Sequence, residues 1–253
     1  MRLRDLRGFQ GEDFAYRLTV RKAAPDFRLS FGTDAPRIPR GGSVAVEVNA
    51  LRQDGFDGPV RLRAVDLPAG LTASQETIAA GETSAVLVLS ADGDAELPVP
   101  TLLRVEGVAQ LDGREVLRRA DPDDRLQVLS LAGESDIFVE LEGDGVSLEA
   151  GGTAAVTVRV ERRNGFTGRV PVTALNLPYG VKVTNIGLNG ILVRPDESRR
   201  EFTLAAEPWV EPQQRGLTVT GRVETRSPRT PEYAAKPIRL EIVRAQAAAG
   251  GAR

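Results

Sequence analysis

Aspartates in two short turns are the first residues of this chain whose type and spacing could do chemistry. Asp92 and Asp94 stand in "ADGDAE", and Asp121, Asp123 and Asp124 stand in "ADPDD". Calcium takes about six to eight oxygen ligands from several carboxylates and carbonyls. Neither cluster has the spaced, glycine-pinned ligand loop of an EF-hand. We interpret both as solvated turns, with calcium binding as the alternative.

Two aromatic residues are the candidates for binding a ligand. Trp209, the only tryptophan, stands in "AEPWVEPQQRG", and Tyr179 stands in "LPYG". Carbohydrate-binding β-sandwiches usually display exposed aromatic platforms, which would give both residues a role. The simpler interpretation is that Trp209 caps an edge of the fold, as large amphipathic rings often do.

The sequence offers no catalytic residue. It contains no histidine and no cysteine, which excludes Ser–His and Cys–His pairs, cysteine nucleophiles and thiolate zinc sites. The motifs GxSxG, GxxxxGK[ST] and HExxH are absent as well. Nothing singles out a carboxylate pair for acid–base hydrolysis. We predict a protein that is not an enzyme and has no cofactor, calcium being the exception to test.

Composition narrows the classes of partner. Hydrophobic residues make up 41% of the chain, charged residues 27%, and the net charge is -2. There is no basic excess to drive binding to nucleic acid. No apolar run reaches the ~18 residues of a membrane span. The first 21 residues contain no signal-peptide core.

The elements that would position these residues are visible in an internal repeat. The phrase "GFDGPVRLRAVDLPAG" at 55–70 returns as "GFTGRVPVTALNLPYG" at 165–180. Aligned without gaps, residues 41–71 and 151–181 share 14 identities in 31 positions. A period near 110 residues is the size of a whole small domain, so we expect two tandem domains.

Apolar residues alternate with polar ones in both copies. They are Val44, Val46, Val48 and Ala50 in the first copy and Ala154, Val156, Val158 and Val160 in the second. Period two with one polar face predicts half-buried strands of an antiparallel sheet. With seven or so short strands in each copy and no helical stripe, the sequence predicts an all-β chain of two tandem immunoglobulin-like antiparallel β-sandwich domains.

Domain boundaries follow from the repeat. We place the first immunoglobulin-like domain at 25–133 and the second at 134–245. Residues 1–24 are expected to be the terminal strand of a truncated upstream β domain, or an edge strand. Residues 246–253 are expected to be a disordered tail. The short junction Ser130–Asp136 would set the orientation of the two domains.

Turn chemistry explains the repeated phrase. Asp54–Gly55 and Asn164–Gly165 lie between two alternating strands, which predicts a β-hairpin in each copy. Phe56 and Phe166, directly after these turns, are expected to close one end of each sandwich. "LPAG" and "LPYG" predict the next turn. Because acids in the first copy become Asn or Thr in the second, we interpret both loops as structural and not as a paired binding site.

The stretch "PRGGSVAVEVNALRQDGFDGPVRLRAVDLPAGLTA" and its second version resemble immunoglobulin-like repeats of large secreted or surface-anchored proteins of environmental bacteria, notably planctomycetes and acidobacteria. "GEDFAYRLTVR", in which Phe14, Tyr16, Leu18 and Val20 alternate, resembles the closing strand of a bacterial pre-peptidase C-terminal domain. This resemblance implies a fragment of an exported multidomain protein that is extracellular, periplasmic or at the cell surface. Any signal peptide would then lie upstream.

The predicted function is that of a non-catalytic spacer or interaction module. Its partners would be the neighbouring domains of the same polypeptide, and possible further partners are a polysaccharide or another surface protein. Two alternatives stay open: a carbohydrate or surface-ligand binding module that uses Trp209 and Tyr179, or an accessory domain of a secreted hydrolase. We expect no nucleic-acid partner and no membrane insertion.

Overall fold

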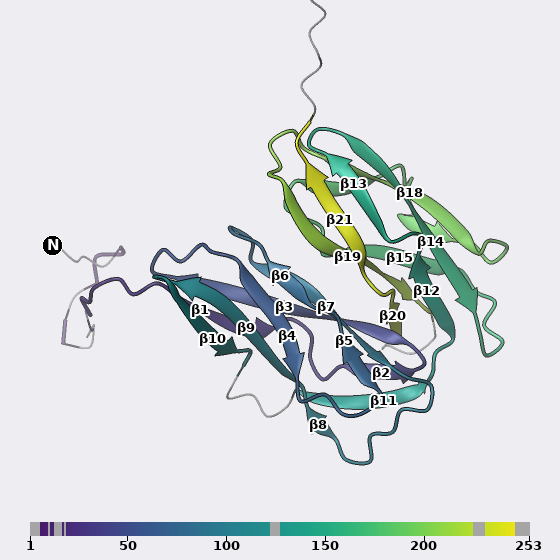
Figure 1. The fold of residues 1–253 in the computed structure, drawn as a ribbon, viewed down its shortest axis with the longest axis horizontal. Coiled ribbons are helices and arrows are strands. Elements are labelled where there is room, and N and C mark those ends of the chain that lie inside the picture. The colour runs from purple at the N-terminus through teal and green to yellow at the C-terminus, as the bar shows by residue number, and fades with distance from the viewer. Residues whose placement is uncertain are drawn as a thin grey trace, which may run out of the picture.

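The computed structural model describes residues 6–9, 11–12, 17, 19–121, 127–224 and 231–245. Every regular element in these ranges is a β-strand, and the strands form two β-sandwiches joined in tandem (Figure 1). The prediction of an all-β chain of two immunoglobulin-like domains is therefore confirmed. Within the same ranges, no helix is long and apolar enough to cross a membrane.

Domain 1 contains strands β1 to β11 in two sheets. Its larger sheet has the order β1 (Asp26–Phe31), β3 (Ser43–Gln53), β7 (Ser84–Ala91), β2 (Arg37–Arg40), β11 (Val128–Glu134) and β8 (Thr101–Leu102), with β5 (Leu71–Ala73) paired to β7. Its smaller sheet has the order β10 (Arg114–Arg119), β9 (Arg104–Leu111), β4 (Val60–Val65) and β6 (Glu76–Ile78). Pairing is antiparallel except where β2 meets β7 and β11.

Domain 2 contains strands β12 to β21, also in two sheets. One sheet has the order β12 (Ile137–Leu141), β14 (Thr153–Arg162), β18 (Arg199–Ala206) and β16 (Val181–Thr184). The other has the order β13 (Gly145–Glu149), β21 (Ile238–Val243), β19 (Gln213–Arg222), β15 (Val170–Leu175) and β17 (Ile191–Val193), with β20 (Glu232–Ala234) paired to β19. Here β13 and β21 form the parallel pair.

Each domain has its own hydrophobic core, and the two cores share no residue. The predicted alternation supplies both of them. Val46 and Val48 of β3 are fully buried in the first core, and Val158 and Val160 of β14 are buried in the second. Phe56 is buried as expected and packs on the Phe27 ring, with 5.4 Å between ring centres.

The predicted hairpins are wrong. β3 pairs with β1 and β7 whereas β4 pairs with β6 and β9, so the turn at Asp54–Gly55 carries the chain from one sheet to the other. Asn164–Gly165 does the same between β14 and β15. The turn chemistry itself is right, since Asp54 and Asn164 have φ of 50° and 51°. A tight turn fixes the local chain direction, but core burial decides which strands pair.

The two ends of the described chain add little regular structure. Residues 19–25 lie in no strand, and Val20 is 83% exposed. Phe14, Tyr16 and Leu18 of the expected terminal strand, and the tail at 246–253, lie outside the described residues. β11 ends at Glu134 and β12 begins at Ile137, so only two residues link the sandwiches. The boundaries at 25, 134 and 246 stay predictions.

The second sandwich packs against the outer face of the larger sheet of domain 1. β20 contacts β3 of this sheet, and β19 contacts β6 at the edge of the smaller sheet (Figure 1). On β7, Leu87 and Leu89 point into the core of domain 1, whereas Val86 and Val88 alternate with them on the opposite face. Val86 and Val88 are nevertheless 8% and 2% exposed. β7 is therefore covered on both of its faces.

Candidate functional site

Each copy of the repeat carries an arginine that ties two loops together. In domain 1, Arg52 donates hydrogen bonds to the backbone oxygens of Gly58, Ala79 and Glu82. Its guanidinium carbon also lies 5.3 Å from the centre of the Phe56 ring. These contacts hold the loop before β7, which contains Glu82, against the end of the sandwich.

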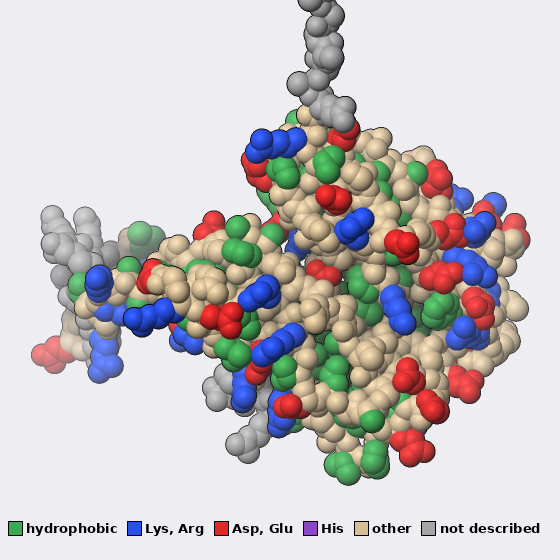
Figure 2. Space-filling model, viewed as in Figure 1, with side chains coloured by type: hydrophobic (Ala, Val, Ile, Leu, Met, Phe, Trp, Pro, Cys, Tyr) green, Lys and Arg blue, Asp and Glu red, His purple; other side chains and the backbone are tan. Residues whose placement is uncertain are grey.

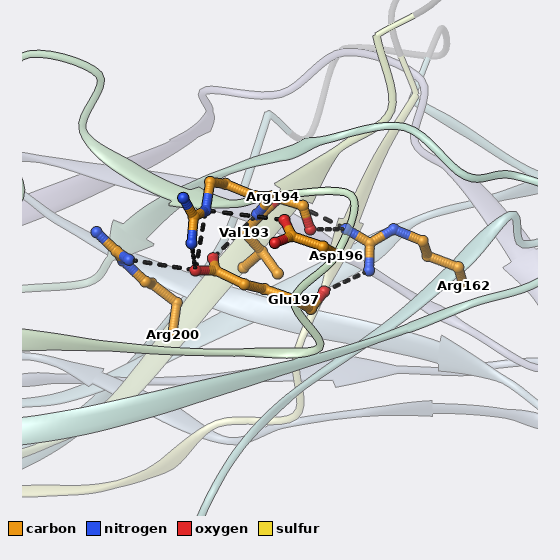
Figure 3. Close-up of polar contacts among 6 residues, drawn as sticks. All are labelled: Arg162, Val193, Arg194, Asp196, Glu197 and Arg200. Atoms are coloured by element: carbon orange, nitrogen blue, oxygen red, sulfur yellow. Dashed lines mark hydrogen bonds and ion pairs between the residues drawn. The ribbon is translucent and has the colours of Figure 1, made fainter.

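Domain 2 repeats this arrangement at Arg162. Its guanidinium donates to the backbone oxygens of Arg194 and Glu197 (Figure 3). The Glu197 carboxylate then pairs with Arg194 at 2.7 Å and with Arg200 at 3.7 Å, all within domain 2. Part of the identity between the two copies is therefore explained by an arginine that each loop needs.

Glu82, unlike Glu197, uses its side chain to reach the other domain. Its Oε1 accepts a hydrogen bond from the backbone N–H of Tyr179 at 2.9 Å. The same oxygen lies 3.5 Å from Nη1 of Arg215. A carboxylate of domain 1 thus contacts both a turn and a strand of domain 2.

Arg215 is the buried cation of this junction. Its side chain is 2% exposed, and Nη2 donates to the backbone oxygen of Ser84 at 3.0 Å. Burial lowers the pKa of Arg215 from its usual value, but an arginine stays charged near neutral pH. An arginine in this setting needs anionic partners, because an unpaired buried charge is strongly destabilising.

Glu76 is a second carboxylate of domain 1 at the junction. It is 8% exposed, and its Oε2 accepts the backbone N–H of Gly216 at 3.2 Å. Burial raises the pKa of Glu76 above its usual value, while the hydrogen bond from Gly216 and the charge of Arg215 act in the opposite direction.

Asn176 adds one hydrogen bond between the domains and one within domain 2. Its Nδ2 donates to the backbone oxygen of Gly216 at 2.7 Å, and its Oδ1 accepts the N–H of Val86 at 3.2 Å. The equivalent Asp66 of domain 1 pairs instead with Arg104 on the surface. The change from Asp to Asn between the copies, predicted as turn chemistry alone, also supplies an amide whose oxygen accepts across the junction while its nitrogen donates within domain 2.

The structure brings the two predicted ligand residues together. The ring centres of Tyr179 and Trp209 are 5.2 Å apart with an interplanar angle of 44°, and the residues are 78% and 56% exposed. Gly180, between them, has φ of 87°, and a Cβ there would lie 2.5 Å from Trp209 Cη2. The turn that carries Tyr179 is therefore also the surface on which Trp209 rests. Ligand binding by this pair stays an untested alternative.

The predicted acidic candidates lie elsewhere. Asp92 and Asp94 are exposed, and the Asp121 carboxylate accepts the N–H of Phe31 at 2.6 Å. Asp123 and Asp124 fall outside the described residues. In the part of the chain that the structure describes, no three acidic side chains are grouped so as to hold a metal. Calcium binding stays an untested alternative to solvated turns.

A cavity of about 550 Å³ separates part of the docked faces. Asp34 and Glu47 of domain 1 and Glu232 of domain 2 line it together with Arg215. The domains therefore meet around this cavity, through the hydrogen bonds of Glu82, Glu76 and Asn176 and the contact of β20 with β3, and not over a continuous dry face. Figure 2 shows basic and acidic side chains interspersed over both domains on the face in view, without a broad patch of one sign.

No protein-family model matches the sequence, and no curated protein matches it. Solved structures similar to this chain include a Porphyromonas gingivalis W83 protein of unknown function, with 13% identity over 86% of this chain and 98% of that one and a TM-score of 0.31. The fibronectin(III)-like modules of Clostridium thermocellum CbhA have 14% identity over 89% and 98% of the two chains, with a TM-score of 0.28. Domains 1–6 of the surface layer protein SbsC have 14% identity over 90% of this chain and 29% of that one, with a TM-score of 0.30. At these TM-scores the matches carry no argument about function.

Sequence reasoning missed the junction residues Glu76, Glu82 and Arg215. One signal could have pointed to them. β7 reads "SAVLVLSA", a nearly continuous apolar run, whereas its counterpart β18 reads "RREFTLAA" and alternates. A continuous apolar run is typical of a strand that is buried on both faces. This pattern indicates that another domain packs on β7 and not on β18.

Proposed function

We propose that this chain is a non-catalytic structural module in which two sandwiches are docked in one orientation, so that it spaces or presents other parts of a larger exported or cell-surface protein. The observation that supports the proposal is the buried junction, where Arg215 and Asn176 of domain 2 bond to β7 of domain 1. The two-residue link between β11 and β12 adds to this restraint. The partners would be neighbouring domains, which the loops at the sandwich ends would contact.

Interdomain distances test this proposal. Since the chain has no cysteine, Gln110→Cys on β9 and Glu201→Cys on β18 introduce two exposed sites for spin labels, one on each domain. Pulsed electron paramagnetic resonance should give one narrow distribution of label-to-label distances when the two sites are labelled in the otherwise unchanged chain. The same pair in an Arg215→Met background should give a broader one. A broad distribution in the parent chain would show a flexible tether and refute the proposal.

A second candidate function is binding of a soluble polysaccharide chain at Tyr179 and Trp209. Exposed aromatic rings in contact, beside the Lys182–Glu207 ion pair at 2.9 Å, offer a sugar both apolar faces and hydrogen-bonding groups. Because the rings are inclined by 44°, one flat surface cannot lie on both of them. This geometry favours single chains over a flat crystalline polysaccharide.

The single tryptophan makes this second function easy to test. Trp209 fluorescence is titrated with soluble polysaccharides, with calcium and with chelator, and binding is checked independently by affinity electrophoresis. Trp209→Ala should lose binding, whereas Leu188→Ala, at a fully exposed apolar residue outside the aromatic pair, should keep it. A flat response across the panel, with the fold intact, would refute the second function and leave the first one standing.

A further inference from the structure

The turn that carries Tyr179 is held from outside its own domain. Glu82 of domain 1 accepts the Tyr179 N–H at 2.9 Å, and its carboxylate faces the buried Arg215 at 3.5 Å. On the other side, Arg52 donates to the backbone oxygen of Glu82 at 3.0 Å. Glu82 is therefore held at its backbone by Arg52, while its carboxylate faces Arg215 and accepts the Tyr179 N–H.

Both halves of the aromatic pair depend on this turn. Tyr179 projects from it, and Gly180 lies against the Trp209 ring. The backbone oxygen of Gly180 also accepts the N–H of Glu207, two residues before Trp209, at 2.9 Å. A displacement of the turn would therefore move Tyr179 and remove the surface on which Trp209 rests.

This contact across the junction is not a general consequence of the repeat. Glu197, the counterpart of Glu82, accepts the same type of backbone hydrogen bond, from Arg162. Its carboxylate nevertheless pairs with Arg194 and Arg200 of its own domain (Figure 3). The two copies use one backbone arrangement for two purposes, and only the first copy directs its carboxylate to the backbone of a turn that carries an aromatic residue of the other domain.

We propose that Glu82 is a positioning residue that couples the docking of domain 1 to the geometry of Tyr179 and Trp209, so that the aromatic surface belongs to the docked pair and not to domain 2 alone. The inference concerns the same surface as the second proposed function and rests on that function where it concerns a ligand. By linkage, a polysaccharide that binds the pair stabilises the docked arrangement to the extent that docking improves its binding.

Variants of Glu82 in the full chain test the coupling without a ligand. Glu82→Ala removes the acceptor, whereas Glu82→Gln keeps a carbonyl oxygen that can accept the Tyr179 N–H. Glu115→Gln, in an exposed ion pair on β10, is the matched control. We expect Glu82→Ala to raise acrylamide quenching of Trp209 and to alter the near-ultraviolet circular dichroism. Glu82→Gln should return both signals towards those of the parent chain, and Glu115→Gln should change neither.

Ligand binding supplies the second arm. If a soluble polysaccharide binds, its affinity should fall about ten-fold in Glu82→Ala, as loss of a hydrogen bond to a charged acceptor implies. If no polysaccharide binds, the second proposed function fails, and the spectroscopic arm still decides the positioning role. Unchanged quenching and circular dichroism in Glu82→Ala overturn the proposal even if a polysaccharide binds. Should Glu82→Ala not fold, Glu82→Asp takes its place, since it keeps the charge but withdraws the acceptor.

Discussion

Replacing Arg215 by methionine is the sharpest test of the junction. Methionine keeps an apolar stem in the space but removes the charge and the hydrogen bond to the Ser84 oxygen. Glu82 and the buried Glu76 would then both lose the positive charge of Arg215, which acts on each of their carboxylates. Removing one partner of a buried ion pair typically costs about 3–5 kcal/mol, and we expect a loss of unfolding free energy in this range.

Urea unfolding measures this loss, because a non-ionic denaturant leaves the charges unscreened. Trp209 fluorescence reports on domain 2, and far-ultraviolet circular dichroism reports on both domains. Coincident transitions in the parent chain should separate in Arg215→Met if docking couples the domains. Arg159→Met, which breaks the exposed pair with Glu140, is the control and should cost less than about 1 kcal/mol.

We also predict a rescue of the stability that Arg215→Met loses. Adding Glu76→Gln and Glu82→Gln to Arg215→Met removes the stranded carboxylates and should recover most of the lost stability. A loss below about 1 kcal/mol in Arg215→Met alone would refute the view that this arginine holds the domains together. Failure of the triple variant to recover would show that the lost hydrogen bond, and not the stranded charge, dominates.

Three further changes probe single contacts. Gly168→Ala would place a Cβ 2.8 Å from the Phe166 ring, and thermal melting should show a loss of about 1–3 kcal/mol. Asn176→Asp cannot donate to the Gly216 oxygen, and urea unfolding near neutral pH should show a loss of about 1–3 kcal/mol. Burial raises the pKa of Glu76 in the folded chain, so its contribution to stability is fully present below the usual value of 4.5 and is lost as pH rises through the raised value. The stability of Glu76→Gln relative to the parent chain should therefore increase from about pH 4.5 to about pH 8; a pH-independent difference would contradict this sign.

Strand alternation and turn conformation could be predicted from the sequence, but which strands pair with one another could not. Alternation placed Val46 and Val48 in the core, and Asp54 and Asn164 adopt the left-handed backbone that their turns require. The hairpin prediction failed because β3 and β4 bury their apolar faces in one core from opposite sheets, which no local pattern encodes.

For the candidate site, single residues could be predicted from the sequence, but the contacts between them could not. Tyr179 and Trp209 could be singled out because large exposed rings in turns are unusual, but their contact depends on folding of segments 30 residues apart. Glu82 and Arg215 could not be paired from the sequence. They are separated by more than a hundred residues, and each has an ordinary surface interpretation when it is considered alone.

The covered strand β7 has a consequence for biosynthesis. Because domain 1 precedes domain 2, Val86 and Val88 face water until the second sandwich is made. At ~5–20 residues per second, the ribosome needs roughly 5–20 s to produce it. During that interval the nascent chain exposes an apolar strip on the face of a central strand. Charged residues, prolines and bulges protect the edges of a sheet but do not cover its face. Domain 2 then covers this strip within the same chain, so the partner that protects the outer face of β7 is always synthesised after it.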